Sequence, residues 1–176
     1  RMDSRRKKAE DAAAAKLKLT MDAAALDDRI RLLTEMEKEY EGFNKAVKTV
    51  MQAAEKNTLR GIHGPVAGLM TTEQAYAVAL ETALGAALQN IVVEREEDAK
   101  AAIQFLKQRD GGRATFLPLT AIRGDELREN AAGEYGFVGI ASRLVRYDAR
   151  YDHIFKNLLG RTVVVDCLLY TSDAAD

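Results

Sequence analysis

One short segment of this chain carries most of the residues that could do chemistry. Residues 60–70 (RGIHGPVAGLM) hold three glycines, a proline and one of only two histidines in the sequence. A histidine framed by glycines can act as a catalytic base, a metal ligand or a phosphate contact. The same segment can equally be a stiff turn that leads the chain into a sheet. The choice between these interpretations decides whether an enzyme is expected.

The immediate neighbours of His63 offer neither a nucleophile nor a carboxylate that could orient the imidazole. Gly61 and Gly64 permit turns with positive φ, and Pro65 fixes its own φ and favours extended geometry before it. We therefore interpret Gly61, His63, Gly64 and Pro65 as a structural loop in which the imidazole bonds to backbone. A short extended piece is expected to follow Pro65.

Sequence motifs for nucleotide and metal chemistry are missing from the chain. It contains neither G-x-x-x-x-G-K-[ST] nor G-x-G-x-x-G after a strand, and glycines 133–139 have the wrong spacing. His63 and His153 are far apart, without paired cysteines or an H-E-x-x-H pattern, so no zinc site is predicted. The single Cys167 cannot form an internal disulfide, which favours a reducing compartment. A catalytic triad built from distant positions stays open, because its members need not be adjacent.

Basic residues form a second candidate site. Lys45, Lys48, Lys56 and Arg60 lie close together in the sequence, and Lys45 and Lys48 are spaced to share one helix face. The formal net charge of −1 gives no global field that would attract nucleic acid. These four residues are therefore candidates for a local DNA contact, which would be weak, sequence-independent and salt-sensitive. The alternative is an ordinary solvated face.

The elements that must position these residues begin with a long helix. Residues 1–41 contain neither glycine nor proline, and apolar residues recur at alternating steps of three and four, which is typical of a coiled coil. At about 1.5 Å per residue such an arm would be about 60 Å long. Its narrow seam favours pairing with another helix over the alternative, a long helix packed on its own domain. The predicted seam consists of Leu19, Ala23, Leu26, Ile30, Leu33 and Tyr40.

The pattern changes after Gly42, where strands and helices alternate and predict an α/β domain with parallel or mixed pairing. Thr71 and Gln74 fit a capping box, in which Thr71 would cap the following helix. Residues 133–140 are expected to be irregular or a short edge strand. Further helices are predicted over residues 43–56, from residue 96 to the glycines at 111 and 112, and over 152–159, and strands over residues 91–93, 114–117 and 162–166. No apolar run approaches the roughly 20 residues that cross a bilayer, and no secretory signal opens the chain.

Three segments resemble one known family. GIHGPVAGLM, ALGAALQNIVVEREEDAKAAIQFLKQRDGGRATFLPL and YDHIFKNLLGRTVVVD are similar to the hinge domain of bacterial structural maintenance of chromosomes (SMC) proteins. The resemblance covers about residues 40–166, and it implies a mixed α/β hinge fold with flanking helices over residues 42–166. Residues 1–41 would be the hinge-proximal coiled-coil arm. Residues 167–176 look like translated adaptor sequence, the alternative being the start of a genuine helix capped by Ser or Thr.

The resemblance also implies a function. SMC proteins are long ATPases that fold back at the hinge, so this chain is expected to be a dimerisation module without enzymatic activity. Its expected partners are a second hinge, the returning arm of the same chain and, weakly, DNA, but no membrane. ATP, Mg and kleisin-type subunits belong to the heads of the parent protein, so no cofactor is expected here. The expected role is chromosome condensation and segregation, in the cytoplasm at the nucleoid.

Two rival interpretations remain at this point. One is a small coil-borne α/β enzyme or ligand-binding domain that uses the loops at His63 and Gly133–Gly139. The other is a purely structural coiled-coil adaptor. A truncated hinge is further expected to expose strand edges and to self-associate.

Overall fold

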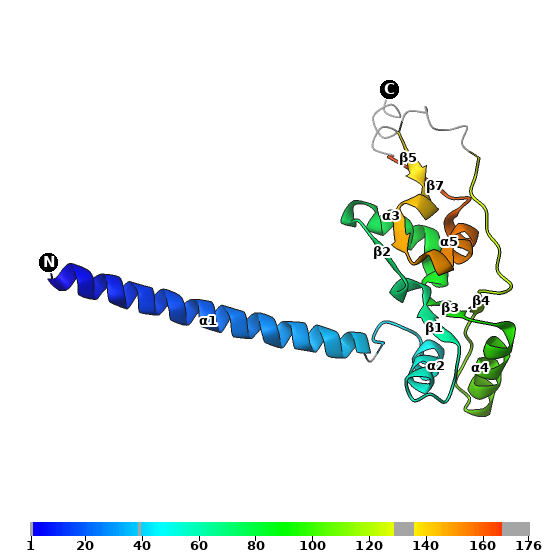
Figure 1. Cartoon of the computed structure of the whole chain (residues 1–176), viewed down its shortest axis with the longest axis horizontal. Helices are drawn as coiled ribbons and strands as arrows, with labels where there is room; N and C mark the ends of the chain where they lie inside the picture. The colour runs from blue at the N-terminus through cyan, green and yellow to red at the C-terminus, as the bar shows by residue number, and fades with distance from the viewer. Residues whose placement is uncertain (1, 39, 129–135, 167–176) are drawn as a thin grey trace, which may run out of the picture. The chain divides into compact units, whose positions relative to one another are not determined.

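The computed structural model describes residues 2–38, 40–128 and 136–166 of the chain. The chain divides into two compact units, Arg1–Gly42 and Phe43–Asp176. The first unit is built on one continuous helix, α1 (Met2–Lys38), in agreement with the predicted helical period (Figure 1). Seam residues Leu19, Leu26, Ile30 and Leu33 all lie on α1 and are between 56% and 69% exposed.

The prediction that Tyr40 belongs to the seam is wrong. Tyr40 follows the end of α1 and has a φ of 53°, and Gly42 has a φ of 91°. A residue in the left-handed region cannot continue a right-handed helix, because its backbone redirects the chain. The heptad pattern of the sequence therefore runs past the point at which the backbone stops being helical.

The second unit is a mixed α/β fold, as predicted, with helices flanking three small sheets (Figure 1). No helix within the described residues is long and apolar enough to cross a membrane. In chain order the helices and strands are α2 (Lys45–Glu55), β1 (Ile62–Pro65), β2 (Met70–Thr72), α3 (Gln74–Leu84), β3 (Ile91–Val93), α4 (Glu96–Gln108), β4 (Phe116–Pro118), β5 (Phe137–Ile140), β6 (Val145–Tyr147), α5 (Asp152–Leu159) and β7 (Val163–Val165).

The largest sheet has the strand order β1-β3-β4. β1 runs antiparallel to β3, and β4 runs parallel to it, so the predicted mixed pairing is confirmed. β3 is the central strand, and all three of its β-branched residues are fully buried. Such a run needs cover on both faces, which suits the centre of a sheet. The remaining sheets pair β2 with β6 and β5 with β7, both antiparallel.

The second unit contains an internal duplication. β1, β2, α3 and β3 are followed later in the chain by β5, β6, α5 and β7 in the same order, each with a short 3-10 turn after its first strand. Both first strands carry the same irregularity, at Ile62/Gly64 in β1 and at Phe137/Gly139 in β5. β2 pairs with β6, so the two repeats meet across an approximate twofold relationship.

The two repeats share one core. Leu80 of α3 and Val92 of β3 belong to the same buried cluster as Ile154, Phe155 and Leu159 of α5. All five side chains are fully buried. Removal of this apolar surface from water is the main force that holds the repeats together.

Several local predictions were wrong. Residues 62–65 form strand β1 rather than a loop, and Val66–Gly68 is a 3-10 turn rather than an extended piece. Thr71 lies in β2 and does not cap α3, whose N-cap is Glu73 with no side-chain cap. In both places pairing with a distant strand replaces the local bonds that the sequence suggested. Residues 133–135 and 167–176 lie outside the described residues.

Candidate functional site

Side chains from both repeats meet at His63 on β1. Its Nε2 lies 2.7 Å from Oε2 of Glu94, and its Nδ1 lies 3.0 Å from the hydroxyl of Tyr151. The imidazole also packs edge-on against the Tyr151 ring, with centroids 5.6 Å apart. Tyr151 is only 7% exposed, and the His63 side chain is 15% exposed. These contacts connect the first repeat to the turn that precedes α5.

The prediction of a structural loop with a backbone-bonded imidazole is therefore wrong in its contacts. That loop consisted of Gly61, His63, Gly64 and Pro65. The partners of His63 are 31 and 88 positions away in the sequence, so no local pattern could indicate them. Gly61 does form a turn, with a φ of 68°, and a Cβ there would collide with the carboxylate of Asp98. A glycine is needed at position 61 for both reasons.

The order hydroxyl, imidazole, carboxylate resembles a catalytic triad, but the geometry favours a structural role. Burial raises the pKa of the Tyr151 hydroxyl, which opposes the activation that a nucleophile needs. A neutral imidazole can accept a hydrogen bond from the Tyr151 hydroxyl at Nδ1 and donate one from its Nε2–H to Glu94. Every polar atom then has a partner. Within the described part of the chain, no group of three or more potential ligands could hold a metal ion.

Substitution of His63 tests this structural role. His63→Ala is expected to lower the free energy of unfolding by about 1–2 kcal/mol, because it leaves the buried Tyr151 hydroxyl without its acceptor. Glu94→Gln is the matched control and should change stability by about 0.5 kcal/mol or less, since Glu94 is half exposed and keeps an acceptor oxygen. Urea unfolding of both variants measures the difference. Equal losses in the two variants would contradict the proposed role of Tyr151.

A strap of residues 119–128 leaves β4 and crosses α5. The backbone oxygen of Arg123 accepts from Nδ2 of Asn157 at 2.8 Å, and the amide of Leu127 donates to the oxygen of Gly160 at 2.8 Å. A Cβ on Gly124 would collide with the amide nitrogen of Asn157. The strap is therefore in direct backbone contact with the helix. No motif predicted it, although the single glycine of the segment was a visible signal.

Charged side chains secure the strap and the adjoining repeat. Ser142 donates to Glu126 at 2.6 Å, and Arg143 donates to its second oxygen at 2.9 Å. The bond from Ser142 is the main cause that lowers the pKa of the Glu126 carboxyl. In the same repeat, burial and the hydrogen bond to Asp152 raise the pKa of Tyr147 to about 12. Both shifts favour the states expected near neutral pH, which are a charged Glu126 and a neutral Tyr147.

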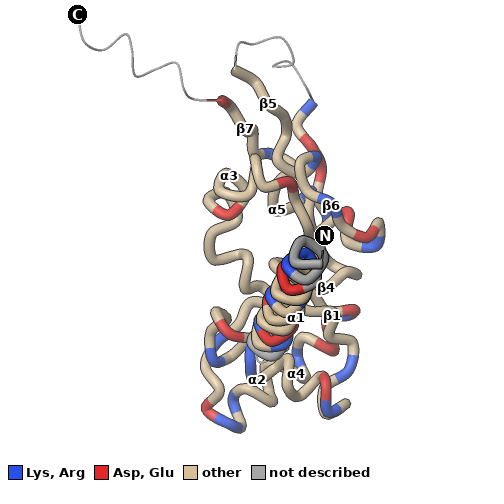
Figure 2. Tube along the Cα trace, turned by 90° about the vertical axis from the view of Figure 1, so that its left-hand side faces the viewer, with Lys and Arg blue, Asp and Glu red and all other residues tan. Residues whose placement is uncertain are grey.

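The four candidate DNA-contact residues lie on or beside α2. Lys45 is exposed and Lys48 is half-buried on this helix, Lys56 is its C-cap, and Arg60 precedes β1. No ion pair joins any of them to a carboxylate within the described residues. Acidic and basic residues both occur on α2, α4 and their loops (Figure 2). The structure thus places two of these lysines on one helix and the third at its C-cap.

Comparison with protein families assigns most of the second unit. The sequence profile of the SMC proteins flexible hinge domain matches residues 59–170. The chromosome partition protein Smc of Bacillus subtilis is 43% identical over 148 residues, which cover 82% of this chain and 12% of that protein. The protein of the same name from Methanocaldococcus jannaschii is 41% identical over 138 residues, 78% of this chain and 11% of that protein. The chain thus spans only about an eighth of the length of these relatives.

Solved structures give the same picture. An asymmetric dimer of the Geobacillus stearothermophilus SMC hinge domain matches with a TM-score of 0.86 and 38% identity, over 96% of this chain and 69% of that one. The Pyrococcus furiosus SMC hinge domain matches with a TM-score of 0.61 and 33% identity, over 76% and 68%. A longer form of that hinge, with an extended coiled coil, matches with a TM-score of 0.57 and 29% identity, over 88% and 54%.

Proposed function

Because this chain belongs to the family of SMC flexible hinge domains, we propose that it is the self-association module of a longer chromosome-organising protein. The observation that carries this proposal is the close match, over nearly the whole chain, to a hinge that crystallised as a dimer. In that role the module joins two copies and needs no chemistry of its own. The rival coil-borne enzyme, using His63 and Gly133–Gly139, finds no support in these matches.

The β5–β7 sheet is the part of the second unit best suited to association. Val163 and Val165 of β7 are 39% and 55% exposed, whereas the three residues of β3, the equivalent strand in the first repeat, are fully buried. β3 is paired on both sides, and β7 pairs only with β5 among the described residues. An exposed apolar strand with an unpaired edge favours pairing with another chain.

Sedimentation equilibrium over a range of concentrations tests this proposal. We expect a reversible dimer that Val165→Lys weakens by about tenfold, because a lysine on a strand edge opposes pairing. Val78→Lys is the matched control, since Val78 is 75% exposed on α3 and belongs to neither strand of the β5–β7 sheet. A monomer at every concentration, or equal weakening by the two variants, would contradict the proposal.

We propose that the arm, helix α1, pairs with a helix that returns from the same parent chain. Leu19, Leu26 and Leu33 recur at heptad spacing on α1 and are exposed, so they require a facing helix to be covered. The extended coiled coil of the Pyrococcus furiosus neighbour is consistent with such pairing. ATP, Mg and kleisin-type subunits would act only at the heads of the parent protein, and the hinge segment itself would need no cofactor. The parent would act in the cytoplasm, at the nucleoid.

We also propose a weak DNA contact through Lys45, Lys48, Lys56 and Arg60. Reversal of all four charges to Glu is expected to weaken binding of a double-stranded oligonucleotide. The logarithm of the binding constant should also fall less steeply with the logarithm of the salt concentration. Its slope should decrease by about one for each phosphate that the protein no longer neutralises. Fluorescence polarisation at several salt concentrations measures both effects. A matched variant with four charge reversals elsewhere on the second unit controls for net charge. Equal weakening of DNA binding in the two variants would contradict the proposed contact and leave the structural coiled-coil adaptor as the interpretation.

A further inference from the structure

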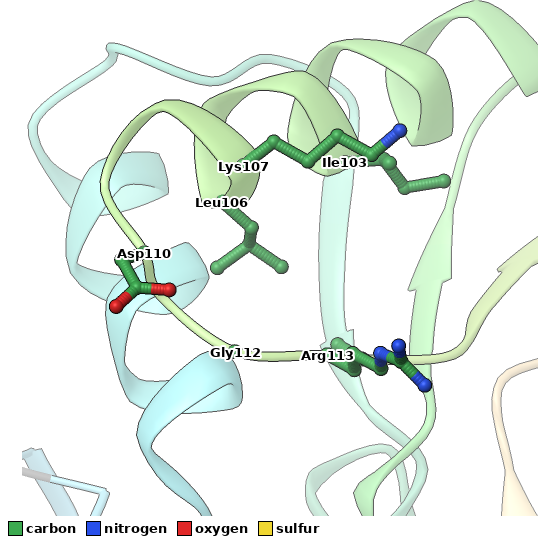
Figure 3. A pocket seen from close by; sticks show the side chains of 7 residues that line it. Ile103, Leu106, Lys107, Asp110, Gly112 and Arg113 are labelled. Atoms are coloured by element: carbon green, nitrogen blue, oxygen red, sulfur yellow. The ribbon is translucent and has the colours of Figure 1, made fainter.

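A groove of about 540 Å³ lies between α4 and the extended segment that leads into β4 (Figure 3). Ile103 and Leu106 of α4 and Ala114 of the segment give it an apolar lining. Ile103 is 40% exposed, so the groove presents aliphatic surface to solvent. Only a glycine fits in the turn at its end, because a Cβ on Gly111 would lie 2.8 Å from a methyl of Leu106.

The rim of this groove is predominantly basic. Lys107 on α4 and Arg113 on the facing segment flank it, and Asp110 lies at one end (Figure 3). Neither Lys107 nor Arg113 forms an ion pair with a carboxylate in the part of the chain that the structure describes. Nζ of Lys45 donates to the backbone oxygen of Asp110 at 3.3 Å, which adds a third cation near that end. An anionic ligand with an apolar centre complements this arrangement.

We propose that the groove binds a short acidic segment of a partner protein. An apolar side chain of that segment occupies the space over Ile103 and Leu106, and its carboxylates face Lys107 and Arg113. Apolar anchors in a preformed groove supply most of the binding free energy of such contacts, and the charged rim supplies orientation and speed of association. This surface is distinct from the β5–β7 sheet proposed for self-association.

The lining favours a peptide over nucleic acid. Single-stranded nucleic acid binds through aromatic side chains on which bases stack, and the groove is lined by aliphatic ones. The nearby Phe105 ring is covered by the guanidinium of Arg109, which lies 4.4 Å from the ring centroid.

Fluorescence anisotropy with the 176-residue chain tests this inference. The probe is a labelled peptide, Gly-Asp-Glu-Leu-Phe-Asp-Glu-Gly, and a second peptide with Lys in place of each acid is its control. We expect saturable binding of the acidic peptide only, weaker at higher salt. Ile103→Lys, and separately the pair Lys107→Glu and Arg113→Glu, should weaken it by about tenfold. Arg161→Glu, a single charge reversal at an exposed site in the other repeat, should leave it unchanged.

All substituted positions are exposed, so each variant is expected to fold, and thermal melting checks this. Four results would overturn the inference: no saturable binding, binding that the groove variants leave unchanged, displacement of the peptide by DNA at equal concentration, or failure of a longer parent chain to bind the peptide. The third would make the groove a nucleic-acid site if DNA still displaced the peptide from the variant with Lys45, Lys48, Lys56 and Arg60 reversed to Glu. The last would mean that another part of the same protein covers it.

Discussion

Gly124→Ala is expected to lower the free energy of unfolding by about 3 kcal/mol, a large effect for the addition of one methyl group. The new Cβ would collide with the amide nitrogen of Asn157 and lie 2.6 Å from the backbone oxygen of His153. Backbone atoms of α5 cannot rotate away as a side chain could. The strap must therefore lift off the helix and lose its bonds to Asn157 and Gly160.

Urea unfolding monitored by circular dichroism measures this loss, with Gly68→Ala as the matched control. Gly68 is exposed, its nearest contact for a Cβ is an ordinary 3.7 Å, and it has no positive φ. Its substitution should change stability by no more than about 0.5 kcal/mol. Gly160→Ala provides a second test, since a Cβ there would collide with the backbone oxygen of Asp125 in the same strap. The double variant should lose less than the sum of the two, because either change already displaces the strap.

Phe155→Ala is expected to lower the free energy of unfolding by about 3–5 kcal/mol. Phe155 is fully buried in the core that the two repeats share, and its ring stacks on Tyr147 with centroids 4.4 Å apart. Removal of the ring creates a cavity that neighbours from both repeats cannot fill without moving. Tyr147 would also lose the apolar face that positions its hydroxyl 3.1 Å from Asp152.

Phe155→Leu is the matched control, because it retains most of the apolar volume, and it should lose clearly less stability than the alanine variant. A single cooperative unfolding transition in wild type, measured by both near-ultraviolet and far-ultraviolet circular dichroism, would agree with one shared core. Two separate transitions, or a loss below about 1 kcal/mol in Phe155→Ala, would show that the repeats fold independently of this contact.

The internal duplication leaves a trace in the sequence that helical and strand periods do not reveal. Gly61 and Gly64 are followed by Leu84-Gly85 and a β-branched run, and Gly136 and Gly139 are followed by Leu159-Gly160 and a similar run. Alignment of the chain with itself brings these two sets of residues into register. The same alignment gives Gly61 and Gly64 the position at β1 that Gly136 and Gly139 have at β5.

Part of the local structure of this protein follows from its sequence alone. The helical period of α1, the amphipathic period of α2 and α4 and the β-branched run of β3 all depend on residues within a few positions of one another, which is why these helices and this strand were predicted correctly. The family resemblance also lay in contiguous segments. Each of these signals is short-range, so a linear pattern is enough to indicate it.

Which surfaces meet, by contrast, depends on the tertiary fold. His63 bonds to Glu94 and Tyr151, the strap lies on the bare backbone of α5, and β2 pairs with β6 instead of leaving Thr71 to cap α3. None of these contacts follows from the residues around it, because each partner lies tens of positions away. They form because burial of one shared apolar core brings those segments together, and the polar groups then bond to whatever that packing places beside them.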